Sequence, residues 1–181
     1  MQHRPDSDIE GCVAAEARLR ETIATLTDDD VRRPSLLPDW TMGHVLTHVA
    51  RNADSHVRMA EGAARGETVW QYAEGQRDRE IGEGATRSAA ALIADVQASA
   101  AAVEAAWAAL SDEVWAHGVA RSSAGVFPIS EQVVRRWREV EFHHADLGLG
   151  FGYADFSPGY VARELADATL PRWGGRTDWP G

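Results

Sequence analysis

Apolar residues recur in steps of three and four along residues 93–110, and this spacing constrains the fold more than any other feature. The series comprises Ile93, Val96, Ala100, Val103, Trp107 and Leu110. Such spacing places the apolar side chains on one face of an α-helix and is typical of the seam of a helix bundle. No alternating pattern of any length predicts a β-strand. The sequence therefore predicts an all-α fold.

Capping residues, prolines and glycines divide the chain into four main helices and a shorter last one. Residues 27–30 are expected to form a polar turn, residues 65–86 to be irregular, and residues 118–127 to form a loop or small ribbon. The predicted fold is a single domain over residues 1–181, a four-helix bundle with a short additional C-terminal helix. We expect helices to begin at Ser7 or Asp8, Thr41, Thr86, Ser130 and Pro158, and the first, second and fourth to end near Leu26, near Gly62 or Ala64, and at Gly148 or Gly150.

Charge and composition exclude several classes of protein. The chain has 181 residues and a formal net charge of -10, and 44% of its residues are hydrophobic. Because an acidic surface repels a nucleic acid duplex, we expect no nucleic acid partner. No stretch approaches the roughly 20 apolar residues of a membrane span, and the N-terminus has no apolar core of the signal-peptide type. The sequence predicts a cytoplasmic protein in which Cys12, the single cysteine, is a buried packing residue.

Two of the predicted helices carry histidines and carboxylates that can hold a metal ion. Glu139 and His143 stand four residues apart on the fourth helix, so they project from the same face. If the second helix is a neighbour, its His48 can complete a site of two imidazoles and one carboxylate. This donor set suits Zn²⁺ held tetrahedrally, with the fourth position open to water or substrate, and it also serves non-haem Fe(II).

The periodicity of the fourth helix favours a different pair of ligands. Its apolar arc contains Trp137 and His144, and Glu141 lies three residues before that histidine. Glu139 and His143 fall on roughly the opposite side from Trp137. Both pairs can chelate a metal ion, and a helix with a solvated face of histidines and glutamates explains the pattern without any metal.

Four short motifs follow one another along the chain between about residues 37 and 148. Any one of them is weak, but four in order at compatible spacing are specific. They are Leu37-Pro-Asp-Trp-Thr-Met-Gly-His-Val-Leu-Thr-His-Val-Ala-Arg-Asn-Ala53, Arg77-x-x-Glu80-Ile81, Pro128-x-Ser-Glu131 and Arg138-Glu-Val-x-x-His143-x-x-Asp-Leu-Gly148. Together they resemble the mycothiol-dependent maleylpyruvate isomerase family, part of the DinB-like superfamily of four-helix-bundle, metal-dependent thiol transferases.

The resemblance implies which residues serve the site. Zn²⁺ or another divalent metal is expected to be bound by His48, Glu139 and His143. We therefore prefer these ligands to Glu141 and His144, the pair that the periodicity favours. Asn52 and Arg77 match family positions and are expected to contact the cofactor.

The resemblance also implies a chemistry. In that family mycothiol, a low-molecular-weight thiol of actinobacteria, binds the open position of the metal as a thiolate. It then attacks an electrophilic carbon, either to isomerise a cis double bond or to transfer the thiol. The expected partners are this thiol and a small electrophilic substrate, and the expected assembly is a monomer or homodimer. Family isomerases continue into a smaller C-terminal domain with a substrate-binding arginine, which this chain is expected to lack.

Other interpretations use the same residues. A metal-dependent hydrolase or a non-haem iron enzyme can be built on the same ligands. A non-catalytic bundle can keep the metal as a structural staple. Arg136 and Arg138, beside the predicted ligands, can hold a bound molecule or the carboxylates in place, or serve the structure alone.

Overall fold

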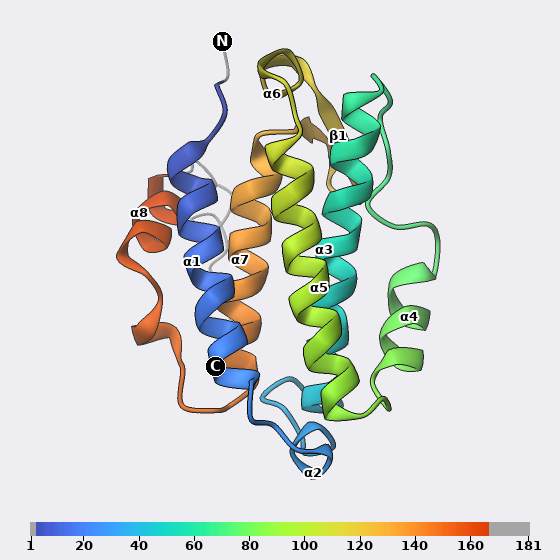
Figure 1. The fold of residues 1–181 in the computed structure, drawn as a ribbon, viewed down its shortest axis with the longest axis vertical. Coiled ribbons are helices and arrows are strands. Elements are labelled where there is room, and N and C mark those ends of the chain that lie inside the picture. The colour runs from blue at the N-terminus through green and yellow to red at the C-terminus, as the bar shows by residue number, and fades with distance from the viewer. Residues whose placement is uncertain (1–2, 167–181) are drawn as a thin grey trace, which may run out of the picture.

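Four long helices form the body of the molecule in the computed structural model, which describes residues 3–166. Figure 1 shows α1 and α7 running in one direction and α3 and α5 in the other. α1 packs against α5 and α7, and α3 packs against the same two helices, which closes the bundle. The predicted all-α four-helix bundle is confirmed, while residues 167–181 of the predicted domain lie outside the described range. The four helices are α1 (Asp6–Ile23), α3 (Met42–Ala64), α5 (Ala89–Ala108) and α7 (Glu131–Asp146).

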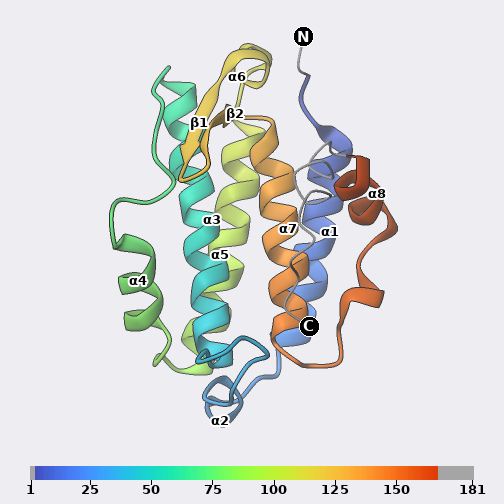
Figure 2. The same ribbon diagram turned by 180° about the vertical axis from the view of Figure 1, so that it is seen from behind.

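The long connection between α3 and α5 follows from their directions. The two helices lie side by side and run the same way (Figure 2). After α3 ends, the chain must therefore run back along the bundle before α5 can begin. This return contains α4 (Gln76–Gly84), so the expectation that residues 65–86 are irregular is wrong for this segment. Ile81 of α4 is buried, and packing against α3 outweighs the low helix propensity of the glycines. α5 begins after Ser88, not at Thr86, because the Ser88 hydroxyl caps its first turn.

Shorter elements join and cover the bundle. The predicted small ribbon is an antiparallel hairpin of β1 (Val119–Ser122) and β2 (Gly125–Pro128). The first helix ends at Ile23, short of Leu26, and the expected polar turn holds a short helix that begins with a capping box. The other short elements are α2 (Asp28–Val31), α6 (Asp112–His117), the 3-10 helix η1 (Tyr153–Asp155) and α8 (Pro158–Ala166).

The predicted seam of α5 lies in the core. Val96, Val103 and Trp107 are buried together with Cys12 of α1, as the sequence predicted. α5 is also the one helix of residues 3–166 that is long and apolar enough to cross a membrane by length and composition. α5 is nevertheless not a run of 20 apolar residues, because it includes Asp95 and Glu104. A helix that forms part of a bundle core meets the length and composition criterion equally well.

A charged pair crosses the centre of the bundle. Arg136 of α7 is fully buried and donates from Nε to Oε1 of Glu16 on α1, over 2.8 Å. Its Nη1 donates to the backbone oxygen of Val49 and to Oδ1 of Asn52, both on α3. Arg136 therefore joins three helices and serves the structure. Arg138 points elsewhere and pairs with Glu164 of α8.

Substitution of Gly11 by alanine is expected to destabilise the bundle. A Cβ atom at Gly11 would lie 2.1 Å from Cη2 of the buried Trp137 ring, so α1 and α7 would have to separate. We expect a loss of about 1–3 kcal/mol in the free energy of unfolding, measured by urea denaturation. Gly82→Ala on α4 is the matched control, because nothing lies within 4 Å of its Cβ position. Equal stability of the two variants would contradict this packing.

Acid is expected to destabilise the fold through His56 of α3. Burial, and then the charge of Arg136, lower the pKa of His56 from 6.5 to about 3. The unfolded chain takes up a proton on this imidazole below about pH 6.5, whereas the folded chain does not until about pH 3. The free energy of unfolding should therefore be unaffected by this group above pH 6.5 and fall as the pH is lowered from 6.5 toward 3.

The His56→Phe variant tests this expectation in urea denaturation of the metal-free protein near neutral pH and in mild acid. The variant should lose less stability on acidification than the wild type. Some loss should remain, because burial also lowers the pKa of His144 to about 4. An equal loss in variant and wild type would show that His56 does not contribute.

Candidate metal centre

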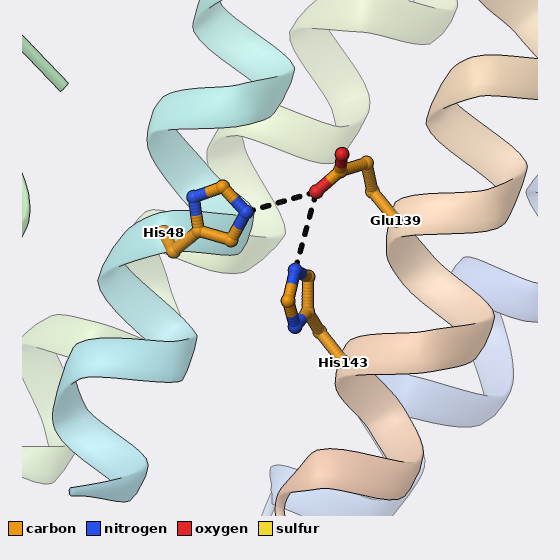
Figure 3. A group of neighbouring side chains, drawn as sticks. All are labelled: His48, Glu139 and His143. Carbon is orange, nitrogen blue, oxygen red and sulfur yellow. Dashed lines mark hydrogen bonds and ion pairs between the residues drawn. The ribbon is translucent and has the colours of Figure 1, made fainter. Parts of the chain in front are cut away.

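Local structure fixes the position of His48 on α3. The hydroxyl of Thr41 accepts from the backbone N–H of His44, while Nδ1 of His44 accepts from the N–H of Thr41. This capping box starts α3 and places His48 in its second turn, with 3% of its surface exposed. Glu139 and His143 stand one turn apart on α7, and Figure 3 shows all three side chains pointing toward one another.

The three predicted ligands meet at one carboxylate oxygen. Oε2 of Glu139 lies 2.8 Å from Nε2 of His48 and 3.2 Å from Nε2 of His143. The two imidazole rings are perpendicular, with centroids 4.5 Å apart. Within residues 3–166, these three side chains form a group of possible metal ligands (histidine, cysteine, aspartate or glutamate) whose ligand atoms all lie within 4.8 Å of one another.

These separations fit a small metal ion. Zn²⁺ holds nitrogen and oxygen ligands at about 2.0–2.1 Å, which places the corners of a tetrahedron about 3.3 Å apart. The distances of 2.8 and 3.2 Å therefore need to open by only a few tenths of an ångström.

Asp146 fixes the orientation of the His143 imidazole through its Nδ1 atom. Its carboxylate is one turn further along α7, and His143 donates from Nδ1 to Oδ2 over 2.8 Å. An ionised carboxylate only accepts hydrogen bonds, so the proton belongs on Nδ1 and the lone pair of Nε2 can face a cation. Sequence reasoning gave Asp146 no role, although its spacing of three residues from His143 is a usable signal.

The electrostatics of the cluster favour a cation. Burial would raise the pKa of Glu139, but the hydrogen bonds from His143 and His48 hold it well below its usual range. Burial lowers the pKa of His48, so this imidazole is neutral near pH 7. Burial also opposes protonation of His143, but its bonds to Asp146 and Glu139 outweigh this and raise its pKa. An ionised carboxylate beside the neutral imidazole of His48 suits a metal ion, which on binding would displace the proton that His143 shares with Glu139.

The pair favoured by periodicity lies on another face of α7. Glu141 and His144 are buried and bound to other groups: Oε1 of Glu141 accepts from Nη2 of Arg18 over 2.8 Å. Nε2 of His144 is hydrogen-bonded to the hydroxyl of Thr22, and its ring stacks on Phe151. This pair therefore joins α7 to α1 and to the segment after α7, and within residues 3–166 it belongs to no group of three possible ligands.

The two predicted cofactor contacts lie at different depths. Asn52 is buried one turn beyond His48 on α3, and its side-chain oxygen is held by Arg136. Arg77 of α4 is partly exposed, with its guanidinium 5.6 Å from the ring centroid of Trp40. The Trp40 ring in turn meets His48 edge-on, at 5.7 Å between centroids. Arg77 thus lies near the exposed rim of the cluster, where its charge acts on His48.

Comparisons with known proteins identify the family and the fold of the chain. The family model described as the mycothiol maleylpyruvate isomerase N-terminal domain matches residues 12–148. The crystal structure of a mycothiol-dependent maleylpyruvate isomerase superposes with a TM-score of 0.82 at 26% identity, covering 87% of this chain and 66% of that chain. A structure of a histidine-to-alanine mutant of this isomerase gives the same values. The comparison with curated proteins found no match.

A more distant structure shares the fold. YfiT from Bacillus subtilis, described as a probable metal-dependent hydrolase with an unusual four-helix bundle topology, superposes with a TM-score of 0.64 at 15% identity. The superposition covers 79% of this chain and 83% of the YfiT chain. The likeness confirms the four-helix bundle fold. Because the family model spans well over half of the sequence, the chain belongs to the mycothiol maleylpyruvate isomerase N-terminal domain family.

Proposed function

We propose that this protein is a metal- and mycothiol-dependent enzyme that acts as an isomerase or an S-transferase on a small electrophilic substrate. The observation that carries the proposal is the meeting of His48, Glu139 and His143 at hydrogen-bonding distances, within a chain of this family. The cytoplasmic location and the small-molecule partners predicted from the sequence belong to the same proposal.

Each residue of the cluster has a role in the proposal. His48 and His143 supply Nε2 and Glu139 supplies a carboxylate oxygen to a divalent ion, for which Zn²⁺ suits the donor set. Asp146 keeps the Nε2 lone pair of His143 directed at the ion. When bound, such an ion lowers the pKa of a thiol at its open fourth position and so supplies a thiolate near neutral pH.

The reaction that follows needs no redox partner. A thiolate held at His48, Glu139 and His143 would supply a nucleophile for an electrophilic carbon, and this chemistry would serve either reversible addition to a conjugated cis double bond or transfer of the thiol. We propose that Arg77 and Asn52, near this site, contact the thiol.

Calorimetric titration with mycothiol tests the proposal. The zinc-loaded protein is expected to bind about one equivalent of the thiol, and the same protein stripped by a chelator is expected to bind far less. The controls are a thioether derivative, which has no ionisable thiol, and a zinc blank without protein. Absence of thiol binding, together with a large drop in the melting temperature on metal removal, would show that the metal is a structural staple.

A further inference from the structure

The loop that precedes α3 places the ring of Trp40 against the metal centre. This ring meets the His48 imidazole edge-on, with 5.7 Å between centroids, and its centroid lies 6.1 Å from that of His44. His44 and His48 are four residues apart on α3, so both imidazoles project from the same face of the helix. The partly buried Trp40 ring therefore packs on the first turns of the helix that supplies His48.

The conformation of this loop, residues 35–40, is fixed by its own hydrogen bonds. The backbone oxygen of Trp40 accepts from the N–H of Ser35 over 2.8 Å and from the Ser35 hydroxyl over 2.9 Å. The N–H of Trp40 donates to the oxygen of Leu37, which closes a β-turn. Asp39 in this turn has a φ of 63°, and a left-handed backbone at a non-glycine residue persists only when the surrounding contacts hold it. The backbone thus holds the Trp40 side chain at a defined place beside α3.

The same loop is joined to the other helix that supplies ligands. The N–H of Leu36 donates to the backbone oxygen of Asp146 over 2.8 Å, and Asp146 is the residue whose carboxylate holds His143. The Leu36 side chain also lies against Gly148, just after α7, where an added Cβ would come within 3.2 Å of it. Loop 35–40 therefore ties the start of α3 to the end of α7 beside the metal centre.

The two histidines of the cluster differ in how their rings are held. Nδ1 of His143 donates to Asp146, whereas Nδ1 of His48 is buried and, within residues 3–166, has no hydrogen-bond partner. Figure 3 shows this nitrogen on the side of the His48 ring turned away from the other two ligands. A neutral imidazole that binds an ion through Nε2 carries its proton on Nδ1, so no acceptor fixes the ring of His48 in that state. The aromatic contacts of His48 are with His143, itself a ligand, and with Trp40.

We propose that Trp40 is a positioning residue of the metal centre, whose ring holds the His48 imidazole with Nε2 directed at the ion. The inference rests on the metal site of the proposed function. An edge-on contact between aromatic rings is favourable and directional, so it restricts rotation of the imidazole about its side-chain bonds. Arg77 of α4 lies against the same Trp40 ring, with its guanidinium 5.6 Å from the centroid, and this cation–π contact helps to hold the ring in place.

Zinc affinity and cobalt spectra of Trp40 variants test this role. Trp40→Leu is expected to raise the zinc Kd, measured by competition with a chromogenic chelator, about tenfold to hundredfold, the loss typical of groups that orient a metal ligand. The visible absorption bands of Co²⁺ bound in the same site depend on the arrangement of its ligands and should shift in this variant. Trp40→Phe keeps an aromatic ring against His48 and should restore most of the zinc affinity and the cobalt bands of the wild type. Trp70→Leu is the matched control, because the Trp70 ring is half exposed and packs on Arg121 of β1, and it should bind zinc like the wild type.

The outcomes separate this inference from the proposed function. If the wild type binds zinc and Trp40→Leu binds it as tightly with unchanged cobalt bands, the metal centre stands and only the inference is wrong. An equal loss of zinc affinity in Trp40→Phe and Trp40→Leu would also contradict the inference. If the wild type does not bind zinc, the proposed function fails and the inference fails with it.

Urea denaturation of the metal-free variants shows whether each of them is folded. Trp40→Met is a second aliphatic variant and replaces Trp40→Leu in the same measurements if Trp40→Leu does not fold. If neither aliphatic variant folds, the Trp40 ring serves the fold and not the orientation of His48, and the inference is wrong.

Discussion

Replacement of His48 by alanine is expected to abolish metal binding, lowering the zinc content from about one ion per chain to nearly none. In the proposed metal site this imidazole is the one ligand from α3, so its loss would leave two ligands that both come from α7. Two ligands cannot hold a tetrahedral ion against water. Glu139→Gln should have the same effect, because an amide lacks the negative charge that the ion requires. Elemental analysis of protein loaded with zinc and then gel-filtered measures the content.

His144→Ala is the matched control for these variants. It removes a buried imidazole from the same helix as Glu139, but this imidazole is bound to Thr22 and stacked on Phe151. We expect it to keep its zinc. Zinc loss in His144→Ala equal to that in His48→Ala would mean that the wrong face of α7 was assigned to the metal.

Arg136→Met is expected to lower the free energy of unfolding by about 3–5 kcal/mol, because it leaves the carboxylate of Glu16 buried without its partner. The substitution also removes the donor to the oxygen of Val49 and to Asn52, so α1, α3 and α7 lose their common link. Urea denaturation with a circular dichroism signal measures the change. A loss of less than about 1 kcal/mol, the size typical of exposed pairs, would show that the pair is not desolvated.

A double variant separates the missing charge from the missing packing. Arg136→Met combined with Glu16→Leu removes both charges and fills the space with apolar atoms, so much of the lost stability should return. Arg163→Met breaks a more exposed pair with Asp8 and should cost much less than Arg136→Met. If the double variant is as unstable as the sum of its single variants, the two side chains do not act as a pair.

The main helices were predictable because their signals are local. The seam of α5 and the Thr41 cap of α3 depend on residues within a few positions of one another. α4 was not predictable in this way, because its glycines disfavour a helix and only packing against α3 stabilises it. Its place in the chain is explained by the parallel course of α3 and α5, which the sequence pattern did not reveal.

The site was only partly predictable from periodicity. α7 contacts both α1 and α3, so it has two inner faces, and the apolar arc marks only the face with Trp137 and His144. Glu139 and His143 lie on the other, more polar face, which a simple apolar pattern assigns to solvent. The family resemblance pointed to these two residues together with His48.

The most direct test of the account is a crystal structure of the zinc-loaded protein with anomalous data collected at the zinc edge. The account predicts one anomalous peak between α3 and α7, at about 2.0–2.2 Å from Nε2 of His48, a carboxylate oxygen of Glu139 and Nε2 of His143. A map with no peak at this position, or with its peak beside Glu141 and His144, would contradict it.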